Sequence, residues 1–212
     1  MKNLFFSMLT ASLAALFLFS ACSSAHSDKK KAITLNDEAS TIQQKVVGNE
    51  WPTDSLDRAV ELYRQAISLD STFGLAYHNL YSSLVLWKKY EEAEDVCSEW
   101  INRHPNDYTF RLRKANLQWI QGKQHLANAE YAHIGEYLDN LPALKVKDNM
   151  DETEIDEAIL RAYNIFIVKD DSAAALSILR QLQGMYPDIQ LVNSSIEKIS
   201  TNSRDEYLRR TH

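Results

Sequence analysis

The chain repeats one pattern of apolar residues at an interval of 34 residues. Ala59, Ala93 and Ala127 are separated by this interval, and apolar residues recur every three or four positions around each of them. Residues at that spacing share one face of an α-helix. A pattern that recurs every 20 to 50 residues is typical of an array of similar structural units. The sequence therefore predicts helices that follow one another as similar hairpins.

Turn-forming residues are scarce, which also favours helices over sheets. The 212 residues include 5 glycines and 4 prolines, which is about 4% of the chain against an average near 12%. Folds built from many short strands need a turn after each strand. Hydrophobic residues make up 45% of the chain, so a packed core can form. We expect an all-α fold.

The segment 77–105 carries the repeated pattern most fully. Its apolar residues fall on two predicted helices that are separated by a break at residues 87–89. The small side chain of Ala93 lets the two helices approach closely, and Pro105 ends the hairpin because proline cannot continue a helix. Cys97 lies on the apolar face of the second helix, so we expect it to be buried and unreactive.

This segment resembles a tetratricopeptide repeat, which is a helical hairpin of 34 residues. Ala93 and Pro105 match the family pattern, and Tyr90 fits the aromatic residue that often precedes the alanine. The departures from the pattern are Tyr77 for Trp, Leu80-Tyr81 for Leu-Gly, and Leu84 for Tyr. The resemblance extends over about residues 40–188 and implies an α-α superhelix (a solenoid) of about four hairpins. A capping helix at about residues 189–199 would close it, and the alternative is an ordinary helical bundle with the same periodicity.

The N-terminus has the features of an export signal. A basic Lys2 precedes an apolar stretch that ends at Phe19-Ser20-Ala21-Cys22. These last residues resemble the lipobox of bacterial lipoproteins, in which the cysteine acquires acyl chains such as palmitate and the chain is cut before it. The resemblance implies a cleaved signal at residues 1–21 and lipidation of Cys22. An ordinary cut near Ala21 and an uncleaved anchor are the alternatives.

The residues after Cys22 help to predict the cellular location of the protein and the boundaries of its domains. In enteric lipoproteins, an Asp directly after the lipidated cysteine marks retention in the inner membrane, and here that residue is Ser23. No run of lysine and acidic residues follows Cys22, so the signal that some lipoproteins carry for export to the cell surface is absent. By resemblance, we expect the outer membrane, with the protein facing the periplasm. The expected parts are a flexible tether at residues 22–38, a helical repeat domain at 39–200, and a frayed tail at 201–212.

The composition argues against several classes of function. A net charge of −6 disfavours a nucleic-acid partner, which requires a basic surface. The sequence has neither a glycine-rich phosphate loop nor a metal-binding motif such as His-Glu-x-x-His. Its acidic pairs stand at predicted helix starts, where the helix dipole favours negative charge. Asp151 to Glu154 fits a capping box there. We expect no enzymatic activity, no metal and no cofactor.

The family resemblance implies a concave face that is lined by the first helix of each hairpin and binds extended peptides or helices. The residues expected to line it are His78, Ser82, Val85, Leu112, Asn116, Trp119, Leu160, Asn164 and Ile167. Trp119 is the expected aromatic anchor for a partner, unless it packs between hairpins. His78 stands where the family's carboxylate-binding sites carry a lysine, so we do not expect such a site.

These features lead to one functional hypothesis and two alternatives. We expect a lipid-anchored periplasmic adaptor that binds a protein or peptide partner, as part of an envelope machine for assembly, secretion or cell-wall remodelling. The first alternative is an enzyme or enzyme accessory with a site on the insertion at residues 139–152. The second is a structural homo-oligomer in which the capping helix extends the array of the next copy.

Overall fold

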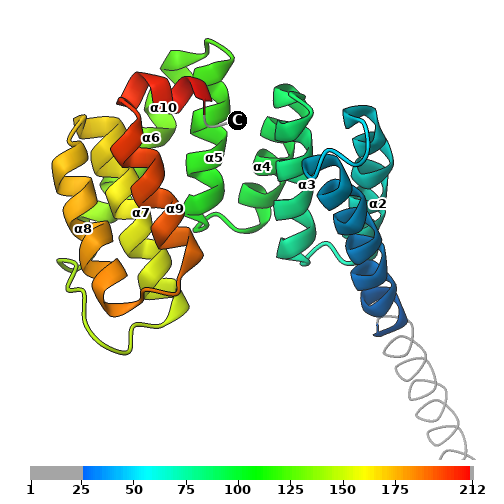
Figure 1. Ribbon diagram of the computed structural model, residues 1–212, viewed down its shortest axis with the longest axis horizontal. Helices are drawn as coiled ribbons and strands as arrows, with labels where there is room; N and C mark the ends of the chain where they lie inside the picture. The colour runs from blue at the N-terminus through cyan, green and yellow to red at the C-terminus, as the bar shows by residue number, and fades with distance from the viewer. Residues whose placement is uncertain (1–25, 211–212) are drawn as a thin grey trace, which may run out of the picture. The chain divides into compact units, whose positions relative to one another are not determined.

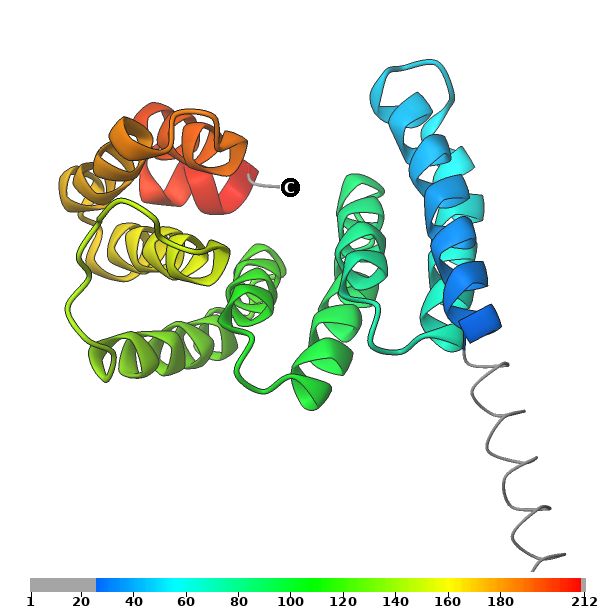
Figure 2. The same ribbon diagram turned by 90° about the horizontal axis from the view of Figure 1, so that it is seen from below.

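The computed structural model describes residues 26–210, and all regular secondary structure in this range is helical (Figures 1 and 2). Successive helices pack in adjacent antiparallel pairs. This confirms the all-α prediction at the level of a sequential helical array. The predicted signal peptide and Cys22 lie outside the described residues. The chain divides into two compact units, with the boundary between Trp87 and Lys88.

The first unit begins with a helix over residues 26–47, followed by η1 (Thr53–Ser55), α2 (Leu56–Leu69) and α3 (Gly74–Leu86). Its first helix corrects the expectation of a flexible tether at residues 22–38, since residues 26–38 are helical. Ala32, Asn36 and Ala39 are buried on one side of this helix, and the amide of Asn79 on α3 donates to Asn36 Oδ1 at 3.0 Å. Small and polar residues form the buried face of the part over residues 26–38, so the hydrophobic pattern did not indicate a helix there, whereas Ile42 and Val46 continue the face further along.

The second unit contains seven helices that follow one another closely. They are α4 (Tyr90–Arg103), α5 (Tyr108–Ile120), α6 (Gln124–Asp139), α7 (Glu152–Lys169), α8 (Ser172–Met185), α9 (Gln190–Thr201) and α10 (Arg204–Arg210). The pairs α4 with α5, α5 with α6, α7 with α8, and α8 with α9 share the largest interfaces. The sequence predicted a hairpin of two helices joined at residues 87–89. The two helices at these positions, α3 and α4, belong to different units.

Side-chain caps fix where several helices of the second unit begin. Asp107 accepts hydrogen bonds from the backbone of Thr109 and Phe110 at the start of α5. Asp151 and Glu154 form the predicted capping box at the start of α7, since each side chain bonds the other residue's backbone N–H. A cap satisfies N–H groups that the first helical turn leaves without partners.

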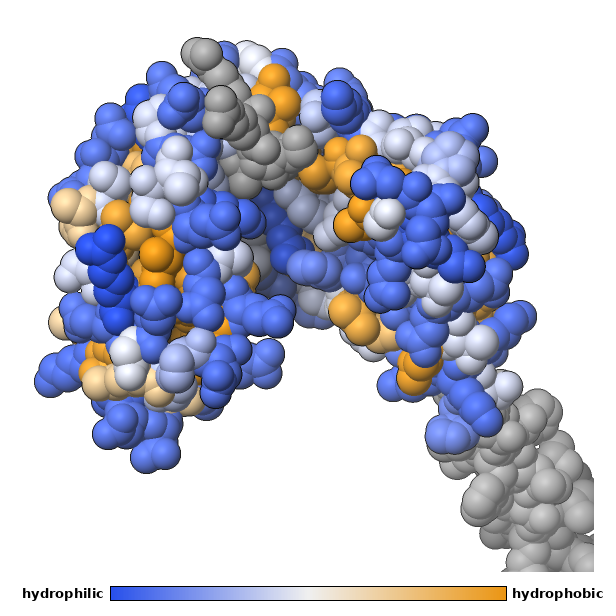
Figure 3. Space-filling model, in the orientation of Figure 1, coloured by the Kyte–Doolittle hydropathy of each residue, from blue (hydrophilic) through white to orange (hydrophobic). Residues whose placement is uncertain are grey.

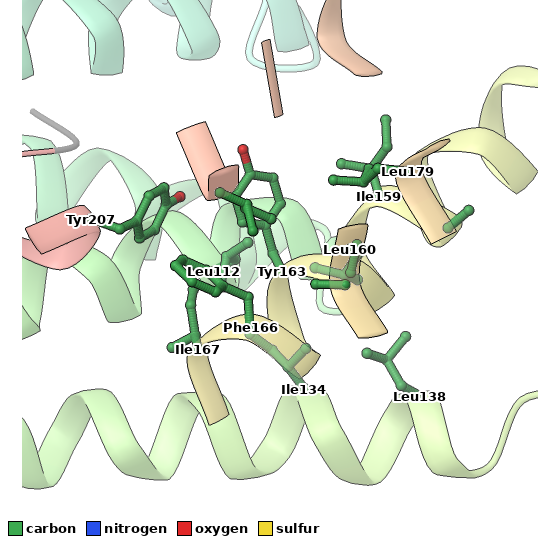
Figure 4. Packing of buried hydrophobic residues seen from close by; sticks show 14 of the residues in the cluster. Leu112, Ile134, Leu138, Ile159, Leu160, Tyr163, Phe166, Ile167, Leu179 and Tyr207 are labelled. Carbon is green, nitrogen blue, oxygen red and sulfur yellow. The ribbon is translucent and has the colours of Figure 1, made fainter. Parts of the chain in front are cut away.

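A hydrophobic core joins α5, α6, α7, α8 and α9 with the C-terminal helix (Figure 4). Phe166 of α7 lies near its centre and is 1% exposed. Leu112, Ile134 and Leu179 reach this core from α5, α6 and α8. Elsewhere in the unit, Cys97 of α4 is fully buried as expected, and burial raises the pKa of its thiol to about 12. Because the thiolate is the nucleophile, this thiol is inert at neutral pH.

The C-terminal helix α10 corrects the expectation of a frayed tail at residues 201–212. Tyr207 and Leu208 are buried, and the Tyr207 ring lies edge-on to Phe166 with the ring centroids 5.4 Å apart. Ser203 caps the helix through reciprocal hydrogen bonds with Glu206. Two large apolar side chains are enough to dock this short segment, although its sequence is mostly charged.

The described surface is mostly hydrophilic. On the face drawn in Figure 3, hydrophobic residues form small patches among polar ones. Val168 near the end of α7 is one of the exposed large hydrophobic side chains, with 45% of its surface accessible.

Replacement of Phe166 tests the importance of the shared core. We expect Phe166→Ala to lower the free energy of unfolding of the second unit by about 3–5 kcal/mol, because it leaves a cavity in the core that α5 to α10 share. Val168→Ala, two residues along the same helix but exposed, is the control and should change it by less than about 1 kcal/mol. Urea titration followed by circular dichroism measures both. Equal effects would contradict the central position of Phe166.

Candidate binding groove

Two adjoining cavities form a groove between α6 and α7 in the second unit. One has a volume of about 370 Å³ and the other about 430 Å³. They lie next to each other, since Tyr131 and Ala132 of α6 and Val168 of α7 line both. The interface of α6 with α7 is smaller than that of α6 with α5 or of α7 with α8, which leaves room for the groove.

The first cavity is mainly apolar. Trp119 at the end of α5, Ile167 of α7 and Leu208 of α10 contribute its hydrophobic walls. Asn128 of α6 and Arg204 of α10 add polar groups. The cavity therefore depends on the docked C-terminal helix, and its lining suits an aliphatic or aromatic side chain.

Asn164, which lines the second cavity, carries a buried amide group without a partner among the described residues. The residue is only 6% exposed, and its Nδ2 makes no hydrogen bond. Leaving a buried donor unsatisfied costs about 1–3 kcal/mol. The Nδ2 atom is itself buried, so it does not face the open part of the cavity.

Gly135 of α6 lies beside this amide. A Cβ atom at this position would be 3.9 Å from both Oδ1 and Nδ2 of Asn164, which is ordinary van der Waals contact. Glycine in a helix interior costs up to about 1 kcal/mol relative to alanine. Alanine would therefore fit here and favour the helix.

Charged groups surround the end of the groove at which the second cavity lies. Glu136 and Asp139 of α6 line the second cavity, as does Lys169 of α7. Within the described residues, neither carboxylate has an ion-pair partner. Both stand in the last turn of α6, where the backbone carbonyls add partial negative charge. This end of the groove thus has an excess of negative charge.

The predicted site residues of the second unit lie in different environments. Trp119 and Ile167 meet in the first cavity, and Asn164 lines the second. Asn116 is buried, and its Oδ1 accepts a hydrogen bond of 2.8 Å from the hydroxyl of Tyr131. Burial raises the pKa of Tyr131, which keeps the hydroxyl protonated as the donor. Asn116 therefore positions a groove wall and does not face the groove itself.

Two other predicted residues of this unit lie outside the groove. Leu112 is buried in the core. Leu160 lines a separate cavity of about 560 Å³ between the α4–α5 loop, α6 and the start of α7. Asp107 and Asp156 also line this cavity. Desolvation, together with the negative charges of Glu152 and Asp107, raises the pKa of Asp156.

The remaining predicted residues belong to α3 in the first unit. His78 is exposed, Ser82 is half-buried, and Val85 is buried. The Ser82 hydroxyl donates to the backbone carbonyl of His78 at 2.9 Å. These three residues do not contribute to the groove between α6 and α7.

Sequence reasoning missed most of the α6 wall and all of the α10 wall. Tyr131, Gly135 and Leu208 were absent from the expected site. A glycine inside a predicted helix is a signal for close approach or open space, and Gly135 carried that signal. Leu208 carried none, because its contribution depends on α10 folding back onto the unit.

Comparisons with protein-family models, curated protein sequences and solved structures find no match for this chain. The helical packing and the groove are therefore interpreted from their own geometry. Within residues 26–210, no group of three or more His, Cys, Asp or Glu side chains is placed to hold a metal ion. None of the helices in that range combines the length and apolar character that a membrane span requires.

The two buried asparagines provide a matched test of the groove geometry. We expect Asn164→Leu to leave the unfolding free energy unchanged or raise it by about 1 kcal/mol, because it removes an unsatisfied buried donor. Asn116→Leu should lower it by about 1–3 kcal/mol, because it strands the Tyr131 hydroxyl. Chemical denaturation measures the free energy of unfolding of both variants. Destabilisation of similar size in both would show that Asn164 has a structural partner.

Proposed function

We propose that this chain is a lipid-anchored adaptor of the tetratricopeptide-repeat type that binds a segment of a partner protein in the groove between α6 and α7. The antiparallel helix pairs and the 34-residue pattern support a repeat array. Arrays of this kind present extended surfaces on which other polypeptides bind. The proposed groove is formed by three helices of the second unit and closed on one side by the C-terminal helix.

The groove between α6 and α7, with an aromatic side chain in its wall, is the observation that carries the proposal. Trp119, Ile167 and Leu208 line one of its cavities and offer a place for an apolar side chain. Asn140, Glu136 and Lys169 line the other and offer polar contacts. A groove with both kinds of wall suits a polypeptide segment.

The N-terminal sequence supports the proposed location. Phe19-Ser20-Ala21-Cys22 resembles a lipobox, and acyl chains on Cys22 would hold the protein at a membrane. We place the protein on the periplasmic face of the outer membrane because Ser23 follows the cysteine. From there the groove would hold a component of an envelope assembly or secretion machine.

Blocking the groove tests partner binding directly. A photo-crosslinking amino acid at Asn140, on the rim of the second cavity, should capture a defined partner in the native cell. Ala132→Trp, at an exposed alanine that lines both cavities, should reduce this crosslink by about tenfold by filling the groove. The measurement is mass spectrometry of the captured protein, followed by binding of the purified partner.

Ala129→Trp is the matched control for this experiment. Ala129 is also an exposed alanine of α6, but it lines neither cavity of the groove. Its variant should crosslink like the unmodified chain. If both tryptophan variants keep the crosslink, the partner binds elsewhere and the proposed groove is wrong.

The lipid anchor is tested at Cys22. Cells fed an alkyne-labelled palmitate should label the unmodified protein and sediment it with the outer membrane. Cys22→Ser should lose the label and appear in the soluble periplasmic fraction, since the serine hydroxyl does not replace the thiol in lipidation. Cys97→Ser is the control and should keep the label, because Cys97 is buried in α4. Labelling of the Cys22→Ser chain would refute lipidation at this residue.

A further inference from the structure

One end of the first unit lies close to the proposed lipid anchor. His26 is the first described residue of the helix over residues 26–47, and it stands four residues after Cys22. A chain segment of four residues spans at most about 14 Å, whatever its conformation. Acyl chains on Cys22 would therefore hold the start of this helix within about 14 Å of a membrane surface.

Hydrogen bonds fix which other residues lie at this end of the unit. Asn79 of α3 donates to Oδ1 of Asn36 at 3.0 Å, and Ser83, one turn further along α3, donates to Oε1 of Gln43 at 3.0 Å. The first helix and α3 therefore run in the same direction, and the start of α3 lies level with about residues 32–35 of the first helix. The turn between α2 and α3 lies at the same end (Figure 2).

Basic and apolar side chains share the surface at this end. The lysines at residues 29–31 are all exposed. Ile33 of the first helix is 50% exposed, and Leu75 at the start of α3 is 55% exposed. We call residues 26–33 and 70–75 together the proximal surface of the first unit. Its combination of ammonium groups with large apolar side chains is typical of segments that lie at a membrane interface.

Two carboxylates near these lysines reduce the positive charge of the proximal surface without cancelling it. Asp28 precedes the lysines on the first helix, and Asp70 stands at the end of α2. Hydrogen bonds from Thr72 lower the pKa of Asp70, and the positive charge of Lys29 lowers it further, so these two groups are close. Three ammonium groups against two carboxylates leave this surface positive, whereas the whole chain has a net charge of −6.

We propose that the proximal surface docks on an anionic lipid membrane, with the lysines at residues 29–31 against the phosphate headgroups and with Ile33 and Leu75 at the boundary of the acyl chains. The inference rests on the lipid anchor of the proposed function. Buried Ala32 and the hydrogen bond of Asn36 to α3 fix the first helix to its unit. Docking of the lysines therefore orients the whole first unit against the membrane.

The short distance to Cys22 favours lipid over an acidic protein as the partner of this surface. The anchor keeps the membrane next to it at a high effective concentration, and an acidic protein would have to enter between the two. Each lysine near an anionic membrane strengthens binding about fivefold, so three would give about a hundredfold. Because Asp28 and Asp70 oppose part of this attraction, we expect about tenfold.

Photo-crosslinking on vesicles tests this inference without relying on lipidation in cells. The chain from Cys22 onward is coupled to a maleimide lipid through the Cys22 thiol, and Cys97 does not react because it is buried. The vesicles contain phosphatidylcholine with or without anionic phosphatidylglycerol, together with a lipid that carries a photoreactive headgroup. We expect lipid crosslinks to residues 70–75, identified by mass spectrometry, to be about tenfold more frequent on the anionic vesicles.

Removal of charge at two sets of lysines supplies the matched control. Replacement of the lysines at residues 29–31 by glutamine should abolish the difference between the two kinds of vesicle. The triple variant Lys88→Gln, Lys169→Gln and Lys198→Gln removes the same charge at exposed lysines of the second unit, and it should keep the difference. Raising the salt concentration should weaken the crosslink of the unmodified chain on anionic vesicles.

The outcomes separate this inference from the proposed function. Equal crosslinking on both kinds of vesicle, or an unchanged preference after replacement of the lysines at residues 29–31, would overturn the inference and leave the groove and the anchor intact. Capture of a protein instead of lipid by a photoreactive amino acid at Leu75 in the native cell would also overturn it. Lipidation in cells is decided by Cys22→Ser alone, because here the anchor is attached chemically.

Discussion

Burial of helix α7 on several sides holds the second unit together. Its residues pack against α6, α8 and α9 at once, and Phe166 also contacts Tyr207 of α10. A helix confined in this way has little freedom to rotate or shift, because protein interiors are close-packed. The groove therefore has one rigid wall, and the Asn164 amide is held in place before any ligand arrives. A preformed wall lowers the entropy lost on binding.

The groove exists because packing is relaxed at one interface of an otherwise close-packed unit. Where α6 faces α7, Gly135 contributes no side chain and Asn164 contributes an unsatisfied amide. Neither choice favours stability: alanine would be the better helix former, and an apolar residue would be the better buried one. Residues that are unfavourable for helix formation or for burial, and that bring no evident gain in stability, occur most often at functional sites.

The sequence predicted what depends on local pattern and missed what depends on distant partners. Buried Cys97 and the capping box at Asp151 follow from helical periodicity and adjacent residues, and both are present. The part of the first helix before residue 39 was missed because Ala32 and Asn36 form its buried face, and α10 was missed because only Tyr207 and Leu208 dock it. Trp119 and Ile167 line one cavity, but the walls from α6 and α10 depend on tertiary packing that periodicity does not encode.

The two asparagines show why residue type alone does not assign a function. Asn116 and Asn164 occupy corresponding helices in the predicted repeats, and both are buried. Asn116 accepts from Tyr131 and so fixes the side chain that forms the wall common to both cavities. Asn164 has no such partner within the described residues and lies beside Gly135. One amide thus shapes the groove and the other is buried without a partner, and the difference arises from which residues of α6 lie opposite each of them.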